Sequence, residues 1–390
     1  MDQRVSAADP AAVLFETRAA AGGRRVGIAT LNRPKTLNGL SLEMARLLDA
    51  QLVAWAQDDT IALVVLQGAG EKAFCAGGDL HALHESMVAY RAAGADDVCD
   101  NRYAAEFFEV EYRLDHRIHT YAKPVLVWGH GIVMGGGIGL MAGGSHRVVT
   151  ERSKLAFPEI TVGLFPDVGG SWLLARVPDR AGLFLALTGA LLGPGDAIHA
   201  QLADVHLAEA DREAVFDALA AEDWTRDDRD NHARLGALLQ RFVAPVEVGP
   251  LQLHAQTVAA LCAHERLEDI VEAIASLEAG DDAWLAAAQK TLAAGSPGSA
   301  RLGFELQARA ADLSLADTFR LEYITALHCA AHGDFAEGIR ALLIDKDRTP
   351  KWEPATLAAT TPAWAQAFFA EPQWPGGTHP LADLGASRAG

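Results

Sequence analysis

The first half of the chain alternates short apolar runs with segments of helical periodicity. Residues 26–31 (VGIATL), 62–67 (ALVVLQ) and 124–128 (PVLVW) are apolar, and β-branched side chains recur in them. Such runs are typical of strands that are buried in a sheet. Residues 41–55 instead place their apolar side chains at helical spacing behind Ser41, a residue type that often caps helices. Strands that alternate with helices predict an α/β architecture.

Strand signals fade after about residue 205, and helical patterns replace them. Residues 267–277 carry apolar side chains at helical spacing, and Ser314 with Asp317 has the pattern of a capping box. The stretch after Trp374 is rich in Gly and Pro, which is typical of loose chain. We therefore expect an α/β core at residues 1–205, a mostly helical region at 206–374 and a loose tail at 375–390.

Charge and composition exclude several classes of function. The net charge of −18 argues against nucleic-acid binding, which needs clustered Lys and Arg. This net charge is compatible with binding of a small ligand that carries phosphate, since such a ligand needs only a local basic patch. Four cysteines without paired spacing indicate a reducing compartment. Neither a secretory signal nor an apolar run of membrane-spanning length is evident, so the sequence predicts a cytoplasmic protein that does not bind membranes.

The stretch from residue 124 to residue 170 concentrates the candidate chemistry. Three consecutive glycines stand at residues 135–137, and Glu159 and Asp167 each follow a proline. Glycines between a strand and a helix let backbone N–H groups approach a ligand closely. Two carboxylates beyond that turn can work as acid and base. Apolar neighbours surround both acids in the sequence, which favours a functional role over a solvated loop position.

Other interpretations of these motifs fit less well. Residues 137–142 (GIGLMA) match G-x-G-x-x-A, but six residues separate Trp128 from Gly135, whereas a dinucleotide-binding turn follows its strand at once. Two interpretations of the glycines stay open at this point. They either only permit tight helix–sheet packing or form an oxyanion site. The serine-hydrolase motif is incomplete, Cys75 has no adjoining His, and the histidines lack metal-ligand spacing. We therefore expect no metal site.

Two glycine-containing segments resemble a known family. AFCAGGDL (residues 73–80) and GIVMGGGIGL (residues 131–140) are similar to the two oxyanion-hole loops of the enoyl-CoA hydratase/isomerase, or crotonase, superfamily. Residues 157–178 and 334–352 resemble a branch of it that hydrolyses CoA thioesters. The resemblance spans roughly residues 13–357. It implies a spiral of strand–strand–helix units with a helical C-terminal region packed against the active site.

The resemblance also implies roles for residues of this chain. The backbone N–H groups of Gly78 and Gly136 would form an oxyanion hole for a thioester carbonyl. Glu159 matches the main catalytic acid of the family, and Asp167 matches the second carboxylate of the hydrolase branch. Glu111, in a segment expected to be helical, matches a substrate-binding acid. The loops that line the acyl-CoA site in relatives correspond here to the loops that hold Lys35, Leu37, Ala76 and Asp79.

One departure from the superfamily pattern separates the candidate activities. Hydratases of the family carry a second Glu at the position of Gly139, so addition of water to a double bond would lack one acid here. Dienoyl-CoA isomerases share the spacing of Glu159 and Asp167 but place an Asp at that same position. The resemblance therefore implies an acyl-CoA thioester hydrolase, with 3-hydroxyisobutyryl-CoA of valine breakdown as the expected substrate. The alternatives are a hydratase or isomerase on the same fold, and a non-catalytic acyl-CoA binding protein.

The expected reaction sets the partners. Acyl-CoA is the small-molecule partner, and CoA enters as part of the substrate, so no separate cofactor is expected. Glu159 would act as a general base on water or as a nucleophile that forms a mixed anhydride. Asp167 would orient Glu159 or the water. Assembly into a homo-oligomer stays open, because crotonases commonly form trimers whereas the long helical C-terminal region could cover that surface.

Overall fold

The computed structural model describes residues 11–386 and arranges their strands in two sheets. The larger sheet has the order β1-β2-β3-β5-β7-β9, in which β1 and β2 are antiparallel and the other neighbours are parallel. The smaller sheet has the parallel order β4-β6-β8. The strands of the larger sheet are β1 Val13–Ala19, β2 Arg25–Leu31, β3 Ile61–Gly68, β5 Val125–Gly129, β7 His146–Val149 and β9 Val205–His206. Those of the smaller sheet are β4 Ala73–Cys75, β6 Ile132–Met134 and β8 Lys154–Ala156.

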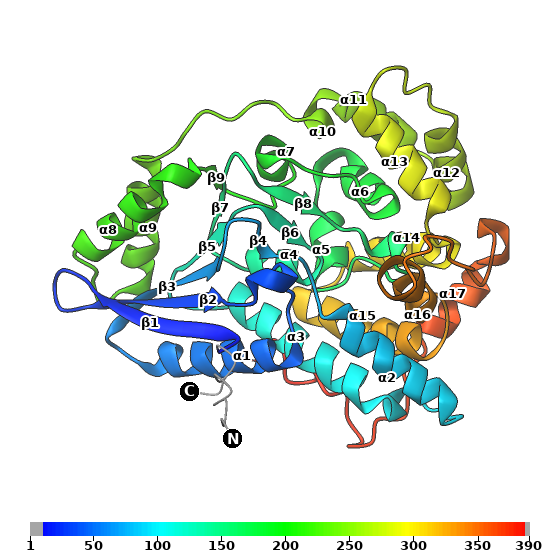
Figure 1. Cartoon of the computed structure of the whole chain (residues 1–390), viewed down its shortest axis with the longest axis horizontal. Helices are drawn as coiled ribbons and strands as arrows, with labels where there is room; N and C mark the ends of the chain where they lie inside the picture. The colour runs from blue at the N-terminus through cyan, green and yellow to red at the C-terminus, as the bar shows by residue number, and fades with distance from the viewer. Residues whose placement is uncertain (1–10, 387–390) are drawn as a thin grey trace, which may run out of the picture.

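The chain extends both sheets together, one unit after another. Strand β3 of the larger sheet leads to β4 of the smaller sheet and then to a helix, and β5–β6–α4 and β7–β8–α5 repeat this pattern. The expected α/β spiral of strand–strand–helix units is therefore confirmed. Figure 1 shows α4 and α5 beside the small sheet near the centre of the molecule. The helices of this half are α1 Leu42–Gln57, α2 Leu80–Ala92, α3 Arg102–His119, α4 Gly136–Ala142, α5 Gly170–Leu174, α6 Ala181–Thr188 and α7 Pro194–His199.

Alternate residues of the larger sheet face two different cores. Leu63, Val65 and Trp128 pack with side chains of α8 (Arg212–Ala221) and α9 (Asp228–Gln240). Val64 and Leu66 belong to the other core, which includes α1. Because both faces are covered, every residue of β3 is buried, as its continuous apolar run predicted.

Two helix starts that the sequence predicted are confirmed. Ser41 accepts a hydrogen bond from the backbone N–H of Met44 at 3.2 Å and caps α1. Ser314 accepts one from the N–H of Asp317 at 3.1 Å and caps α15. A serine at this position satisfies an N–H group that the first helical turn leaves without a partner.

The chain beyond β9 is mostly helical, as expected. Helix α15 packs along α3, and the rings of Phe319 and Tyr112 lie 5.6 Å apart at this contact. Figure 1 shows α10–α13 at the upper right of the molecule and α14–α17 at its right. The remaining helices are α10 Pro250–Leu253, α11 Ala255–Leu261, α12 Leu267–Ser276, α13 Ala283–Ala294, α14 Pro297–Ala310, α15 Leu315–Ala331, α16 Phe335–Ile339 and α17 Pro362–Phe368.

The stretch after Trp374, which we expected to be loose, packs on the fold as far as residue 386. Leu381 is fully buried, and Arg320 of α15 donates a hydrogen bond to its carbonyl at 3.1 Å. Arg113 of α3 donates one to Asp383 at 3.0 Å. A few apolar and acidic side chains therefore dock a segment whose Gly and Pro content suggested mobility. Among residues 11–386, no helix combines the length and apolar character needed to cross a bilayer.

Candidate active site

The three parallel strands of the small sheet deliver three of the candidate residues to one edge. Gly78 follows the end of β4, Gly136 follows the end of β6, and Glu159 follows the end of β8. The carboxyl ends of neighbouring parallel strands lie at the same edge of a sheet, which is where open α/β sheets bind their ligands. Because β4, β6 and β8 pair side by side, these residues lie close together although they are far apart in the sequence.

The two glycine loops bring their backbone amides together. A Cβ built on Gly136 would lie 3.5 Å from the amide nitrogen of Gly78 and would collide with Glu111 Oε1. Gly77 has φ +106°, and a Cβ there would lie 3.3 Å from the carbonyl of Met134. Only glycine adopts such a backbone at this distance without strain. The arrangement allows two adjacent N–H groups to approach one ligand atom.

Glu159 opens a 3₁₀ turn, Glu159–Thr161, directly beside these loops. Its side chain is buried, and a Cβ on Gly135 would lie 3.0 Å from its Oε1. Within residues 11–386, Oε2 has no hydrogen-bond partner. Burial, and then repulsion from Asp167, raise the pKa of Glu159 well above its ordinary value. A carboxyl with one unengaged oxygen and a raised pKa is suited to take a proton from water.

Asp167 lies close to Glu159 but is held differently. The hydroxyl of Tyr112, on α3, donates a hydrogen bond of 2.8 Å to Asp167 Oδ2. Burial raises the pKa of Asp167 to about 6, while the Tyr112 hydrogen bond opposes that rise. The chain leaves Asp167 through two left-handed residues, Val168 (φ +53°) and Gly169 (φ +80°), before α5 begins. This turn aims the carboxyl into the protein.

Glu111 lies on the buried side of α3, where the sequence predicted a helix. Its Oε1 faces Gly136, and burial, followed by repulsion from Asp167, raises its pKa well above the ordinary value. The structure thus brings together all five residues of the expected catalytic and acid set: Gly78, Gly136, Glu111, Glu159 and Asp167.

Two further buried acids join this group, and sequence reasoning missed both. Asp115 lies one turn after Glu111 on α3, and neither of its carboxyl oxygens has a partner among the described residues. Glu322, on α15, is also fully buried, and its pKa rises to about 8, chiefly through burial. The available signal was helical spacing: Asp115 shares a face with Glu111, and Glu322 lies between apolar residues of an otherwise buried helix.

Asp115 explains the departure at Gly139. A Cβ built on Gly139 would lie 2.7 Å from Asp115 Oδ2 and 2.7 Å from Val168 Cβ. Real Cβ atoms do not approach other heavy atoms this closely, so a longer side chain has no room here. The second acid of a hydratase cannot enter this helix unless Asp115 and Val168 move.

Cys75 is buried next to Gly137. Burial raises the pKa of the Cys75 thiol to about 12, so it stays a thiol at neutral pH and packs as a small apolar side chain. In the part of the chain that the structure describes, no three His, Cys, Asp or Glu side chains are arranged to hold a metal ion.

The expected substrate-loop residues lie on two loops that run side by side. The backbone N–H of Ala76 donates to the carbonyl of Leu37 at 3.1 Å. Asp79 caps α2 and lies 3.4 Å from the guanidinium of Arg33, whereas Lys35 is exposed to solvent. A pocket of about 440 Å³ lies between the loop of Lys35 and Leu37 and the turn between β3 and β4, and neither Ala76 nor Asp79 lines it. Its lining includes Pro34, Lys35, Leu37, Asn38, Glu71 and Lys72.

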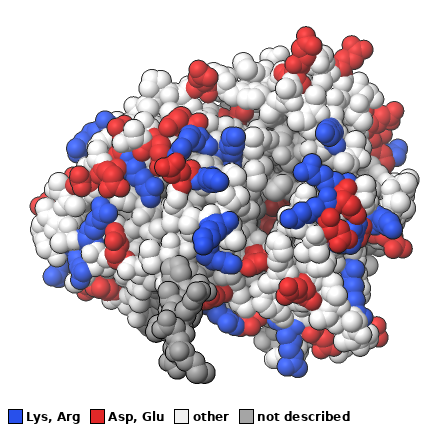
Figure 2. Space-filling model, viewed as in Figure 1, with Lys and Arg blue, Asp and Glu red and all other residues white. Residues whose placement is uncertain are grey.

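On the face of the molecule drawn in Figure 2, the local charge differs from the negative net charge of the whole chain. Figure 2 shows that the face is hollowed near its centre and that Lys and Arg side chains lie on both sides of the hollow. Acidic side chains are spread more widely over the same face. Local positive charge of this kind can attract an anionic ligand even though the whole chain carries −18.

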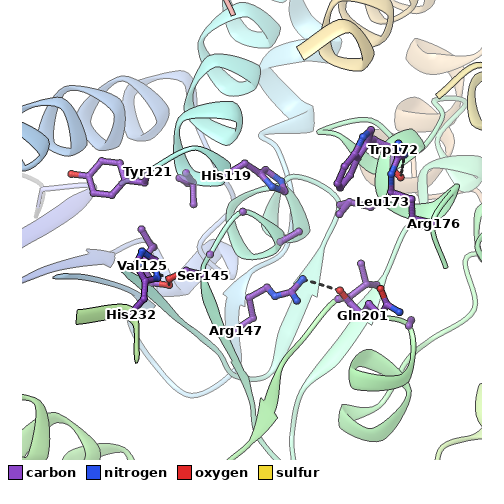
Figure 3. A pocket seen from close by; sticks show the side chains of 16 residues that line it. His119, Tyr121, Val125, Ser145, Arg147, Trp172, Leu173, Arg176, Gln201 and His232 are labelled. Atoms are coloured by element: carbon purple, nitrogen blue, oxygen red, sulfur yellow. Dashed lines mark hydrogen bonds between the residues drawn. The ribbon is translucent and has the colours of Figure 1, made fainter. Parts of the chain in front are cut away.

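A second pocket, also of about 440 Å³, lies at the opposite end of α4 and contains none of the expected site residues. Figure 3 shows His119 and Trp172 near one another on one side of it, with Arg147 and Gln201 on another. Its two arginines already have protein partners. Arg147 pairs with Asp204 at 2.5 Å and donates to the Gln201 carbonyl at 2.8 Å, and Arg176 donates to backbone carbonyls. This pocket is separate from the acid group.

Comparisons with known proteins agree with the geometry. The model of the enoyl-CoA hydratase/isomerase family matches residues 26–369. The mitochondrial 3-hydroxyisobutyryl-CoA hydrolase of Danio rerio is 38% identical over 88% of this chain and 87% of the relative. The Homo sapiens protein of the same name is 34% identical over 86% of this chain and 83% of the relative.

Two solved structures are similar over nearly the whole chain. A carnitinyl-CoA dehydratase from Mycobacterium thermoresistibile has a TM-score of 0.81 at 36% identity and covers 94% of this chain and 98% of its own. An enoyl-CoA hydratase from Rhodobacter sphaeroides has a TM-score of 0.79 at 36% identity, with 92% and 97% covered. Both likenesses include the helical C-terminal half.

The relatives correct one expectation and settle the family. We expected a cytoplasmic protein, but the curated relatives are named as mitochondrial proteins, which contradicts that expectation. Unpaired cysteines indicate a reducing compartment and do not distinguish one such compartment from another. The family match over residues 26–369 and the relatives at 34–38% identity agree with the strand–strand–helix spiral and its glycine loops. The chain belongs to the enoyl-CoA hydratase/isomerase family.

Proposed function

We propose that this protein hydrolyses 3-hydroxyisobutyryl-CoA to 3-hydroxyisobutyrate and free CoA, a step of valine breakdown. The curated relatives are named for this reaction. The observation in the fold that carries the proposal is the unengaged Oε2 of Glu159 beside the adjoining amides of Gly78 and Gly136. Water and the thioester are the only reactants, and CoA enters as part of the substrate.

The chemistry follows from these groups. The N–H groups of Gly78 and Gly136 would bind the thioester oxygen as the carbonyl becomes tetrahedral and negative, a contribution worth roughly 10²–10³ in rate per donor. Glu159 would take the proton of the attacking water. The C–S bond then breaks, and the thiolate of CoA leaves and takes the proton that Glu159 holds, which restores the carboxylate. Asp167 would hold the water or Glu159 in position through its own fixed carboxyl.

Glu159 can also attack the carbonyl directly, which would produce a mixed anhydride and release CoA before water enters. A single-turnover reaction distinguishes the two routes. Rapid quenching followed by intact-mass measurement should find an acyl adduct on Glu159 in the nucleophilic route and none in the general-base route.

A hydratase function has weaker support, although two similar solved structures carry hydratase or dehydratase names. The second acid of that reaction would have to project from Gly139, where Asp115 and Val168 leave no space. A non-catalytic acyl-CoA binding protein is disfavoured because a binding role does not need a buried carboxyl whose oxygen has no protein partner.

We further propose that the pocket along Lys35, Leu37 and Lys72 receives part of the CoA moiety, with the two lysines near its phosphates. Acyl-CoA is then the small-molecule partner. Assembly into a homo-oligomer belongs to the same proposal, and light scattering on the purified protein tests it.

The decisive assay measures thiol release from 3-hydroxyisobutyryl-CoA, 3-hydroxypropionyl-CoA and other short acyl-CoAs, with hydration of crotonyl-CoA measured beside it. We expect free CoA from 3-hydroxyisobutyryl-CoA and negligible hydration. Hydration of crotonyl-CoA without thiol release would overturn the proposed function.

A further inference from the structure

We propose that Glu322, on the C-terminal helix α15, is a positioning residue that holds Asp167 in its working place. The inference rests on the proposed function, because it concerns the same reaction. Glu322 is separated from Asp167 by 155 positions in the sequence and has no role in the family resemblance described above. What connects the two residues is a set of contacts between α15 and the turn that follows Asp167.

Both carboxyl oxygens of Glu322 accept hydrogen bonds from the backbone of that turn. Oε2 accepts a hydrogen bond from the N–H of Gly169 at 2.7 Å, and Oε1 accepts one from the N–H of Ser171 at 2.9 Å. Both bonds are buried. Loss of either acceptor would leave a buried backbone N–H group without a partner, which is costly. The two amides lie two and four residues after Asp167, so they set the direction in which the chain leaves it.

This turn needs such support because its backbone is unfavourable. Val168 has φ +53°, a left-handed conformation that is rare for a β-branched residue. Gly169 follows with φ +80° and has no side chain that could cap α5. Strained backbone persists only where surrounding contacts over-determine it, and such places cluster at active sites. Glu322 supplies two of those contacts from another part of the chain.

Helix α15 also reaches the side chain of Asp167 through Tyr112. The Tyr112 hydroxyl donates to Asp167 Oδ2, and the Tyr112 ring packs against Phe319 and Tyr323, three residues before and one residue after Glu322. Phe319 additionally touches Gly169, where a Cβ would lie 3.2 Å from its ring. One helical segment therefore fixes both the backbone and the carboxyl of Asp167. The C-terminal helices are thereby part of the apparatus that orients the reacting groups.

The test uses Glu322→Gln in the full-length protein, with thiol release from 3-hydroxyisobutyryl-CoA as the assay. The amide keeps the size of the side chain, but its NH₂ group would face an N–H donor, so one of the two bonds is lost. Small displacements of a catalytic group can cost about 10²-fold in rate. We expect kcat to fall by roughly 10–100-fold while KM changes less than about threefold.

A double-mutant comparison separates positioning from general stability. If Glu322 acts through Asp167, Glu322→Gln should change kcat less than about twofold in an Asp167→Asn background, because the group that it positions is already disabled. Thr325→Val serves as the control. Thr325 is buried one turn further along α15 and hydrogen-bonds only within that helix, to the Leu321 carbonyl at 2.8 Å. This variant should keep the wild-type kcat.

Each outcome has one meaning. Wild-type kcat in folded Glu322→Gln, or an equal loss of kcat in the wild-type and Asp167→Asn backgrounds, overturns the positioning role. If Glu322→Gln does not fold, Glu322→Asp replaces it: this variant keeps a buried acid that is too short to reach both amides, and it should show the same kcat loss and the same dependence on Asp167. Absence of thiol release by the wild-type protein would instead overturn the proposed function, which keeps the two failures distinct.

Discussion

The five buried carboxyl groups of the site differ in what their oxygens contact. Both oxygens of Glu322 accept backbone N–H groups, and one oxygen of Asp167 accepts the Tyr112 hydroxyl. Glu159 keeps one oxygen without a protein partner beside the glycine loops. A fully engaged carboxyl cannot take a proton from water without losing its bonds. Asp115 also has no partner on either oxygen among the described residues, but it lies beside Gly139 and not at the two glycine loops. A free oxygen and a position beside those loops together make Glu159 our proposed proton acceptor.

At the residue scale, Glu159→Gln should reduce the rate of thiol release by about 10²–10⁴, the usual contribution of a general base. The amide keeps the shape of the side chain but has neither proton affinity nor nucleophilicity. Thermal stability should hold or rise, since a neutral group replaces a buried acid. Glu43→Gln, an exposed change on α1, is the control and should alter neither quantity. Near-normal turnover in Glu159→Gln would remove this residue from the mechanism.

At the scale of elements, close packing of helix α4 determines the geometry of the site. All of its residues, from Gly136 to Ala142, are buried, and its glycines face backbone or side-chain atoms that a Cβ would strike. Gly137 is closed off by the carbonyl of Cys75, and Gly139 by Asp115 and Val168. The glycines of this helix thus serve two purposes: they allow α4 to pack closely, and they expose the N–H of Gly136.

Gly139→Ala should therefore destabilise the protein by about 1–3 kcal/mol, the usual cost of overpacking a well-filled interior. Chemical denaturation of the purified variant measures this value. Gly193→Ala is the matched control, because a Cβ at Gly193 meets no atom within 4 Å and its φ is ordinary. Equal stability of the two variants would show that the space beside Gly139 can adjust, and the steric argument against a hydratase acid would fail with it.

Two exposed lysines beside the small sheet are candidates for binding the phosphates of CoA. Lys35 and Lys72 line the same pocket, and both are exposed. If they face CoA phosphates, Lys35→Ala and Lys72→Ala should each raise KM by roughly 2–5-fold, as expected for solvent-exposed ion pairs, and leave kcat unchanged. The effect should shrink at high ionic strength. Lys290→Ala, on the exposed side of α13, should leave KM unchanged. A matching rise in that control would mean that only general electrostatics is measured.

How much of the site the sequence could reveal depends on the distance between the contacting residues along the chain. The loops at Gly78 and Gly136, and the acids Glu159 and Asp167, are recognisable because each belongs to a short segment with its own pattern. Glu322 is not, because its partners lie more than 150 residues away and its helix shows only ordinary periodicity. Asp115 looks like one more polar residue on α3 until Gly139 is seen beside it. Tertiary contacts of this kind leave little local signal.

At the scale of the whole molecule, the buried acids make folding depend on pH. Unfolded carboxyl groups titrate near pH 4, whereas burial raises the pKa of Asp167 to about 6 and that of Glu322 to about 8. Between these values the folded chain binds more protons than the unfolded chain, so stability falls as pH rises. Histidines act in the opposite sense below pH 6.5, since burial lowers the pKa of His119 to about 4. Above pH 6.5 the acids lower stability together with the cysteines, because burial raises the pKa of Cys75 to about 12 and that of Cys99 and Cys262 to about 11. Comparison of an acid variant with the wild type from pH 6.5 to pH 8.5 separates the contribution of that acid.

Thermal melts across that window should show a Tm that decreases steadily with pH, with at most about 1.4 kcal/mol of stability lost per pH unit for each titrating group. Glu322→Gln removes the group whose pKa lies inside the window, so its Tm should decrease less steeply than that of the wild type. Thr325→Val alters the same helix without removing an ionisable group, and its slope should match the wild type. Identical slopes in all three proteins would mean that Glu322 carries the same charge in the folded and unfolded chain. The two N–H groups that donate to Glu322 would then lower its pKa by more than burial raises it. Glu322 would hold the turn after Asp167 as a carboxylate throughout this pH range.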